Sequence, residues 1–152
     1  MTVHHAITFK AQSRSDLCWA ASIAMVMQTR GRHMTDTDVA AEAALVNQDG
    51  VTQIELENVC RHFGLDRIQN ASRDVYHWEH LLQSGPVVCA VSAGSDLSGA
   101  HIVVVSGAAS LPEGGGHIYV LDPWFGEGWL PYEDFLGKYN HRQEQWERTT
   151  FQ

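Results

Sequence analysis

A cysteine near the start of the chain stands where a nucleophile is expected. Cys18 follows Ser15 and Asp16, both suitable helix N-caps, and precedes a run of small and apolar helix formers from Ala20 to Met27. This pattern predicts a helix that begins beside Cys18. The unpaired N–H groups and the positive dipole end at a helix start favour the thiolate, which is the reactive form of cysteine. We therefore interpret Cys18 as a catalytic nucleophile.

An amide side chain just upstream of the cysteine meets a second requirement of this chemistry. Attack of a thiolate on a carbonyl group develops an oxyanion, which needs hydrogen-bond donors. The side chain of Gln12, six residues before Cys18, is one such donor, and the backbone N–H of Cys18 is the other. The spacing thus predicts an oxyanion hole at the helix start.

A thiol nucleophile also needs a base, and the base needs a group that orients it. His101 opens an apolar run after a Ser/Gly-rich loop, and Asp122 closes the next run at an Asp-Pro-Trp corner. These two ends meet if the runs are neighbouring antiparallel strands. Taken alone, His101 is also explained as a half-buried strand histidine, and Asp122 as a turn former before proline. His117, which starts a strand after three glycines, is a competing histidine.

The elements that must position these residues change character along the chain. Helical periodicity, capping boxes and glycine stops predict helices first, at residues 20–30, 39–46, 54–63 and 75–82. Apolar β-branched runs then predict strands, at residues 86–91, 101–107 and 117–122. We also expect shorter elements: an edge strand at 3–9, a strand at 126–130, a helical turn at 132–138 and a loosely ordered tail at 141–152. Helices followed by an antiparallel sheet predict an α+β fold.

Length and charge limit the classes of function. The chain has 152 residues, enough for a buried core, and we expect one compact domain over residues 1–152. Its net charge of -8 argues against non-specific nucleic-acid or anionic-membrane binding. No apolar run approaches the roughly 20 residues that span a bilayer, and no signal peptide is evident. We expect a cytoplasmic protein, or one secreted by a route that needs no signal peptide.

The other cysteines do not suggest a disulfide or metal site. The chain has three cysteines, Cys18, Cys60 and Cys89, with no Cys-x-x-Cys pair, which suits a reducing compartment or a working thiol. Cys60 and Cys89 occupy apolar positions and are expected in the core. His62 lies two residues from Cys60 on a predicted helix, so their side chains point to different faces. The chemistry requires no metal or organic cofactor.

The segment around Cys18 resembles a known family. Gln12, five intervening residues and the run Cys18-Trp19-Ala20 at a helix start are similar to the papain-like cysteine peptidase superfamily. Papain has Cys-Gly-Ser before its nucleophile, whereas this chain has Ser15-Asp16-Leu17. Compact bacterial relatives match better, in particular the peptidases that trim double-glycine leaders from bacteriocins and the small papain-like effector peptidases.

The resemblance extends to the two other motifs. Residues 99–104 and 120–124 resemble the His and Asp/Pro motifs of the bacteriocin-leader peptidases, and the order Cys, His, Asp is papain-like. This implies a papain-like fold, in which the helix of the nucleophile packs on an antiparallel sheet, and a triad of Cys18, His101 and Asp122 with Gln12 as oxyanion donor. The motif context favours His101 over His117. Papain has asparagine as third member, and Asp122 keeps the acceptor while adding charge.

By the same resemblance the chain is a cysteine peptidase with a peptide or protein substrate. Trp124 would shield the His101–Asp122 pair, and Trp19, Trp124 and Trp129 are candidate substrate contacts, with core packing as the alternative for each. Three other functions remain open. They are another thiol-dependent amide hydrolase or transferase, such as a peptidoglycan amidase, deamidase or acyl transferase; an effector toxin with an inhibitory or immunity protein; and a non-catalytic module that binds leader peptides.

Overall fold

The computed structural model describes residues 1–44, 53–68, 74–91, 101–139 and 150–152, and the predicted loop at 92–100 and most of the predicted tail lie outside them. The helices are α1 (Cys18–Met27) followed by the 3-10 turn η1 (Gln28–Arg30), α2 (Asp36–Ala43), α3 (Gln53–His62), α4 (Val75–Leu82) and α5 (Tyr132–Tyr139). The strands are β1 (Thr2–His4), β2 (Val87–Val91), β3 (His101–Ser110), β4 (Gly116–Asp122), β5 (Gly126–Pro131) and β6 (Thr150–Phe151). This order confirms the α+β prediction.

The strands form one antiparallel sheet in the order β5-β4-β3-β2-β6, with β1 also paired to β3. One edge of β3 is shared. β2 pairs with residues 101–105, and β1 pairs with residues 107–109. The change falls at an irregularity between Val105 and Gly107, where the register of β3 against β4 shifts. β3 is therefore the central strand, and its first residue is His101.

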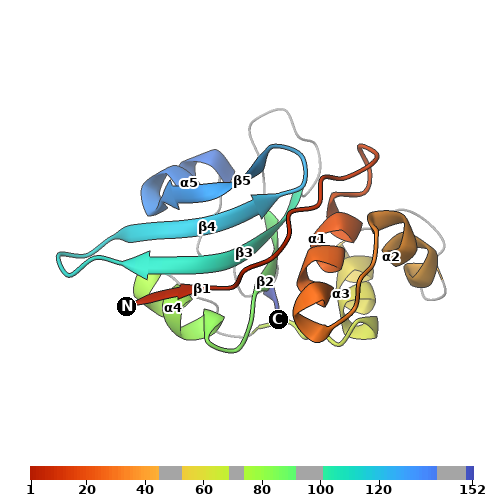
Figure 1. Ribbon diagram of the computed structural model, residues 1–152, viewed down its shortest axis with the longest axis horizontal. Helices are drawn as coiled ribbons and strands as arrows, with labels where there is room; N and C mark the ends of the chain where they lie inside the picture. Colours follow the sequence, from red (N-terminus) through yellow and green to blue (C-terminus); the bar gives the residue numbers. More distant parts are fainter. Residues whose placement is uncertain (45–52, 69–73, 92–100, 140–149) are drawn as a thin grey trace.

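Helices pack against both faces of the sheet, with α4 and α5 on one face and α1 to α3 beside one end of the other (Figure 1). At that end α1 contacts the sheet, and α2 and α3 belong to the same core cluster as alternate strand residues such as Val88, Ala90 and Val104. The opposite face, which includes Val87 and Cys89, packs against α4 and α5. Because β2 and β3 are covered on both sides, their side chains are apolar without alternation. Within the described residues, no helix has the length and apolar character needed to cross a membrane.

Most helix boundaries follow the predicted signals. Thr35 and Asp38 form the expected capping box of α2. Gly31 and Gly64 have φ angles of 76° and 77°, the left-handed conformation that suits a glycine after a helix. α4 spans Val75–Leu82, as predicted.

Both ends of the chain differ from the prediction. The N-terminal strand stops at His4 rather than continuing to residue 9, because β2 occupies the rest of that edge of β3. The end of the predicted loose tail is instead strand β6, which pairs with Val88 and Cys89. Phe151 explains this, since its aromatic side chain is buried in the core on the α1 side of the sheet.

Candidate active site

The Cys18 thiol sits at the first residue of α1 and is half-buried. The expected caps are wrong: Leu17 is the N-cap residue and no side chain caps the helix, so neither Ser15 nor Asp16 has this role. The reason is local, because the Leu17 N–H bonds the Arg14 carbonyl at 3.2 Å in a turn, and the Leu17 side chain is buried. The N–H groups of the first helical turn therefore have no side-chain cap beside the sulfur.

A buried histidine and a buried carboxylate meet at one end of the sheet. His101 starts β3 and Asp122 ends β4, and these antiparallel neighbours bring His101 Nε2 to 2.7 Å from Asp122 Oδ1. The side chain of Cys18 lies close enough to the same imidazole to raise its pKa. Since Nε2 faces Asp122, Nδ1 is the ring nitrogen left for the sulfur. The structure thus brings Cys18, His101 and Asp122 together.

The Asp122 carboxylate accepts several hydrogen bonds besides that from His101. The backbone N–H groups of Trp124 and Phe125 donate to Oδ1 at 2.9 and 3.2 Å. The Tyr139 hydroxyl donates to Oδ2 at 2.9 Å. Burial raises the pKa of Asp122, but the His101 contact and these other donors outweigh it, so the pKa lies below the ordinary value. Asp122 remains a carboxylate at neutral pH.

The imidazole of His101 is shifted toward its charged form. Burial lowers its pKa, whereas the hydrogen bonds to Asp122 and Cys18, together with their charges, raise it. The balance raises the pKa of His101 from 6.5 to about 9. At neutral pH the ring is therefore an imidazolium, the partner that a thiolate needs.

The loop that carries Gln12 is anchored at both sides of the site. The Gln12 backbone N–H bonds the Pro123 carbonyl at 3.1 Å, directly after Asp122. Its side-chain Nε2 donates to the Arg14 carbonyl at 2.8 Å, which leaves one amide hydrogen for a further acceptor. The next N–H, from Ser13, donates to Asp36 Oδ2 at 2.6 Å, a contact from the N-terminus of α2. These bonds place the Gln12 amide upstream of Cys18 within a fixed loop.

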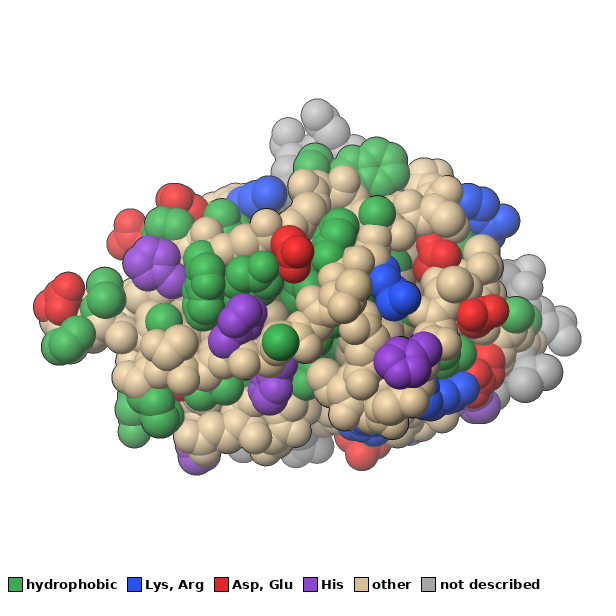
Figure 2. Space-filling view, in the orientation of Figure 1, with side chains coloured by type: hydrophobic (Ala, Val, Ile, Leu, Met, Phe, Trp, Pro, Cys, Tyr) green, Lys and Arg blue, Asp and Glu red, His purple; other side chains and the backbone are tan. Residues whose placement is uncertain are grey.

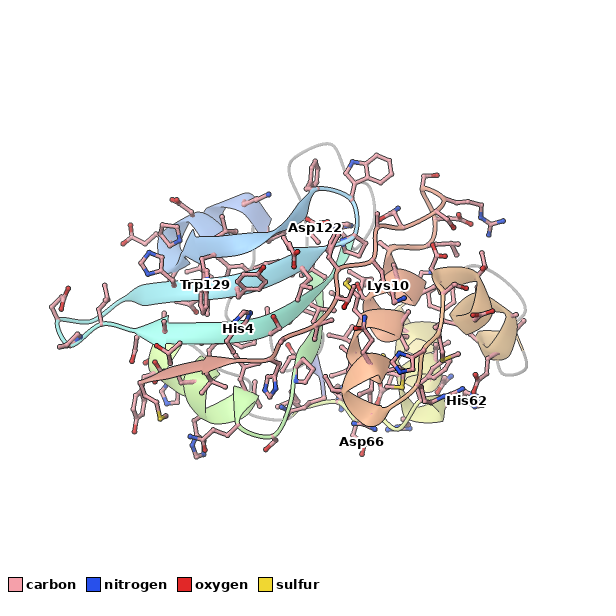
Figure 3. All side chains as sticks on the ribbon, viewed as in Figure 1. His4, Lys10, His62, Asp66, Asp122 and Trp129 are labelled. Carbon is pink, nitrogen blue, oxygen red and sulfur yellow. The ribbon has the colours of Figure 1, made fainter. Side chains whose placement is uncertain are left out.

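The three candidate tryptophans occupy different environments. Trp19 is half-buried and packs against the core on the α1 side. Trp124 is 57% exposed, directly after the Asp122-Pro123 corner. Trp129 is 40% exposed and packs against Tyr119 and His4, further along the sheet from Asp122 (Figure 3). Hydrophobic and histidine side chains gather over this part of the sheet (Figure 2).

Several functional contacts were not predicted from the sequence. The Phe125 ring lies edge-on to His101 at a centroid distance of 6.3 Å, whereas the shielding expected of Trp124 stays a prediction. Tyr139 was missed because the predicted helical turn stopped one residue short, although its spacing of four from buried Phe135 marks an inward-facing position. Asp36 has no local sequence signal for its contact with the Ser13 N–H. None of these partners is evident without the tertiary structure.

The competing residues lie elsewhere. His117 is near the opposite end of β4 from Asp122, paired with Ala109 and Pro131. The helical spacing predicts that His62 and Cys60 point to different faces. In the structure His62 contacts Glu42, and Cys60 is buried. Cys60 and Cys89 are buried, which confirms their predicted place in the core. Burial raises the pKa of the Cys60 thiol to about 12 and also raises that of Cys89, so both are poor nucleophiles.

The fold as a whole is similar to that of solved peptidase structures. They include a C39-like peptidase from Bacillus anthracis, with 17% identity, a TM-score of 0.67, and coverage of 99% of this chain and 96% of that chain. The peptidase domain of Streptococcus ComA, a bifunctional ABC transporter of a quorum-sensing pathway, has 16% identity, a TM-score of 0.64 and 95% coverage of both chains. A double glycine motif protease from an AMS/PCAT transporter, in complex with the leader peptide, has 19% identity, a TM-score of 0.58, and coverage of 90% of this chain and 88% of that chain.

These similarities show that the chain shares the fold of these peptidases. No sequence among the curated proteins matches significantly. The family model described as papain-like cysteine protease AvrRpt2 matches residues 2–139, and the chain belongs to this family. The protein is accordingly a cysteine peptidase.

Proposed function

We propose that the chain hydrolyses peptide bonds with Cys18 as nucleophile, His101 as acid and base, and Asp122 as the group that orients the imidazole. Gln12 and the Cys18 backbone N–H are the proposed oxyanion donors. The observation that carries this proposal is the meeting of three groups at the start of α1. His101 Nε2 lies 2.7 Å from Asp122 Oδ1, and the Cys18 side chain lies beside the same imidazole. Membership of a cysteine protease family supports the same assignment.

The first half of the proposed reaction forms a thioester. The Cys18 thiolate forms a bond from Sγ to the substrate carbonyl carbon, and the carbonyl π electrons move to oxygen. The oxyanion accepts hydrogen bonds from Gln12 Nε2 and the Cys18 N–H. As the electrons return, the C–N bond breaks, and His101 gives its Nδ1 proton to the leaving amine.

The second half regenerates the enzyme. Neutral His101 takes a proton from water as the water oxygen bonds to the thioester carbon. The C–S bond then breaks, the carboxylic acid product leaves, and the thiolate is restored beside the imidazolium. Asp122 stays ionised throughout and stabilises the charged ring, in keeping with its lowered pKa.

A polypeptide substrate is part of the proposal. One of the similar structures is a protease in complex with a leader peptide, which supports a peptide as ligand. We assign Trp124 and Trp129 as substrate contacts because both are substantially exposed. Trp19 follows the nucleophile directly, and we assign its half-buried ring to the border of the same site.

The test combines thiol labelling with hydrolysis. Under reducing conditions at neutral pH, iodoacetamide should alkylate Cys18 and spare buried Cys60 and Cys89, as mapped by mass spectrometry. Wild-type protein should degrade fluorescently labelled casein, and Cys18→Ala should abolish this without changing the circular dichroism spectrum. Persistent hydrolysis by Cys18→Ala would refute the nucleophile assignment. Activity only on peptidoglycan fragments, or only as deamidation of protein glutamines, would refute the peptidase substrate.

A further inference from the structure

The last residue of α5 reaches the buried carboxylate of the proposed triad. Tyr139 is only 1% exposed, and its hydroxyl donates to Asp122 Oδ2 at 2.9 Å. The three other hydrogen bonds to this carboxylate, from His101, Trp124 and Phe125, all go to Oδ1. Among the described residues, Tyr139 is therefore the donor that satisfies the second oxygen.

We propose that Tyr139 is a positioning residue whose hydroxyl fixes the rotation of the Asp122 carboxylate, so that Oδ1 stays directed at His101 Nε2. This inference rests on the triad proposed above. A buried carboxylate oxygen without a donor is unfavourable, and rotation about the Cβ–Cγ bond would let it compete for the donors of Oδ1. The Tyr139 hydroxyl removes that competition and stabilises the charge.

The direction of this hydrogen bond is fixed. Burial and the adjacent carboxylate raise the pKa of Tyr139, so its hydroxyl keeps the proton and always donates. Asp122, with a lowered pKa, always accepts. The bond therefore persists across the pH range in which a thiolate and an imidazolium coexist.

The last turn of α5 also lies close to the partner of Asp122, His101. The Lys138 ammonium lies 5.1 Å from the centroid of the Phe125 ring and 5.5 Å from that of Tyr139. Phe125 in turn packs edge-on against His101. The last turn of α5 thus contacts Asp122 through the Tyr139 hydroxyl and reaches His101 through the Phe125 ring.

The contribution of the Tyr139 hydroxyl can be measured separately from that of the packed ring. Tyr139 packs against Phe135 with a centroid distance of 5.4 Å, and Tyr139→Phe keeps this aromatic contact while removing one oxygen atom. Tyr132→Phe is a matched control, because Tyr132 starts the same helix, is partly buried, and also packs against Phe135, at a centroid distance of 6.2 Å. The comparison isolates the bond to the carboxylate.

The assay needs a defined substrate. The fragments that the wild-type protein releases from casein identify a cleavage site. A short peptide that spans this site is then synthesised with a fluorophore on one side of it and a quencher on the other. We expect Tyr139→Phe to lower kcat about tenfold with KM nearly unchanged, because a hydrogen bond to a charged group supports the transition state. The acid limb of the pH profile should move to higher pH, since Asp122 loses a donor and its pKa rises. Tyr132→Phe should change neither.

A double-mutant cycle tests whether Tyr139 acts through Asp122. In an Asp122→Ala background, Tyr139→Phe should have no further effect on kcat. An equal loss in both backgrounds, a wild-type pH profile for Tyr139→Phe, or an equal effect of Tyr132→Phe would overturn the inference. If Tyr139→Phe does not fold, 3-fluorotyrosine at position 139 keeps the shape and strengthens the donor. The acid limb should then move to lower pH, and an unchanged limb counts against the proposal.

Failure of the proposed function gives a different result. If Asp122→Ala hydrolyses the peptide as fast as the wild-type protein, the triad itself is wrong. If Asp122→Ala is impaired while Tyr139→Phe matches the wild type in rate and pH profile, the triad stands and only the role of Tyr139 is lost.

Discussion

The two sides of the proposed active site are held by different means. On the helical side, Cys18 begins α1 without a side-chain cap, and Gln12 is fixed mainly through backbone bonds of its loop. On the sheet side, the Asp122 carboxylate accepts from two side chains and two backbone N–H groups and is almost completely buried. The difference suits the two tasks. Donors for an oxyanion must be free before substrate binds, whereas an orienting carboxylate needs all its partners in advance.

Removal of the Gln12 side-chain amide is expected to have the largest effect on kcat of the changes on the helical side. Gln12→Ala should lower kcat by about a hundredfold, because an oxyanion donor acts mainly in the transition state. KM should change little, and steady-state hydrolysis of the quenched peptide measures both. Gln83→Ala is the matched control, since Gln83 is exposed at the C-terminal end of α4, on the opposite face of the sheet. Similar losses in both variants would show that Gln12 acts only on the fold.

A smaller effect is expected from the contact that anchors the Gln12 loop. Asp36→Ala removes the acceptor of the Ser13 N–H, and we expect kcat to fall about fivefold, the equivalent of one ordinary hydrogen bond. Asp38→Ala, in the same helical turn, removes the acceptor of the Thr35 N–H instead. It should lower the free energy of unfolding slightly and leave kcat unchanged. Urea unfolding and peptide hydrolysis separate the two outcomes, and equal kcat values would contradict the anchoring role.

The smallest effect concerns stability on the sheet side. The pKa of His101 is raised from 6.5 to about 9 in the folded chain. The stabilisation that protonated His101 contributes to folding is therefore complete below pH 6.5 and is lost as the pH rises through about 9. Thermal unfolding followed by circular dichroism should show the melting temperature falling by a few degrees across this interval. His101→Gln should lack this decline, and a parallel decline in the variant would assign it to other groups.

Local patterns predicted the elements that carry the site. The apolar run after Cys18 gave α1, and the two β-rich runs gave β3 and β4, whose antiparallel pairing brings His101 to Asp122. Features set by distant partners were not predictable in this way. The Tyr139 hydroxyl meets a carboxylate 17 residues away, and Asp36 meets a backbone N–H 23 residues away. No periodicity records such pairs, since each depends on how helices pack around the sheet.

The short β1 strand has a consequence for the opposite end of the site. The N-terminal segment leaves the sheet after the His5 N–H bonds the Ser106 carbonyl, and it is held again where Gln12 bonds Pro123. Midway, the Gln28 side chain binds both backbone groups of Thr8. Residues 6–11 thus form a tether of set length between the middle of the sheet and the loop that carries Gln12. A lost residue in this tether would shift Gln12 relative to Cys18 while leaving every residue of the proposed site in the sequence.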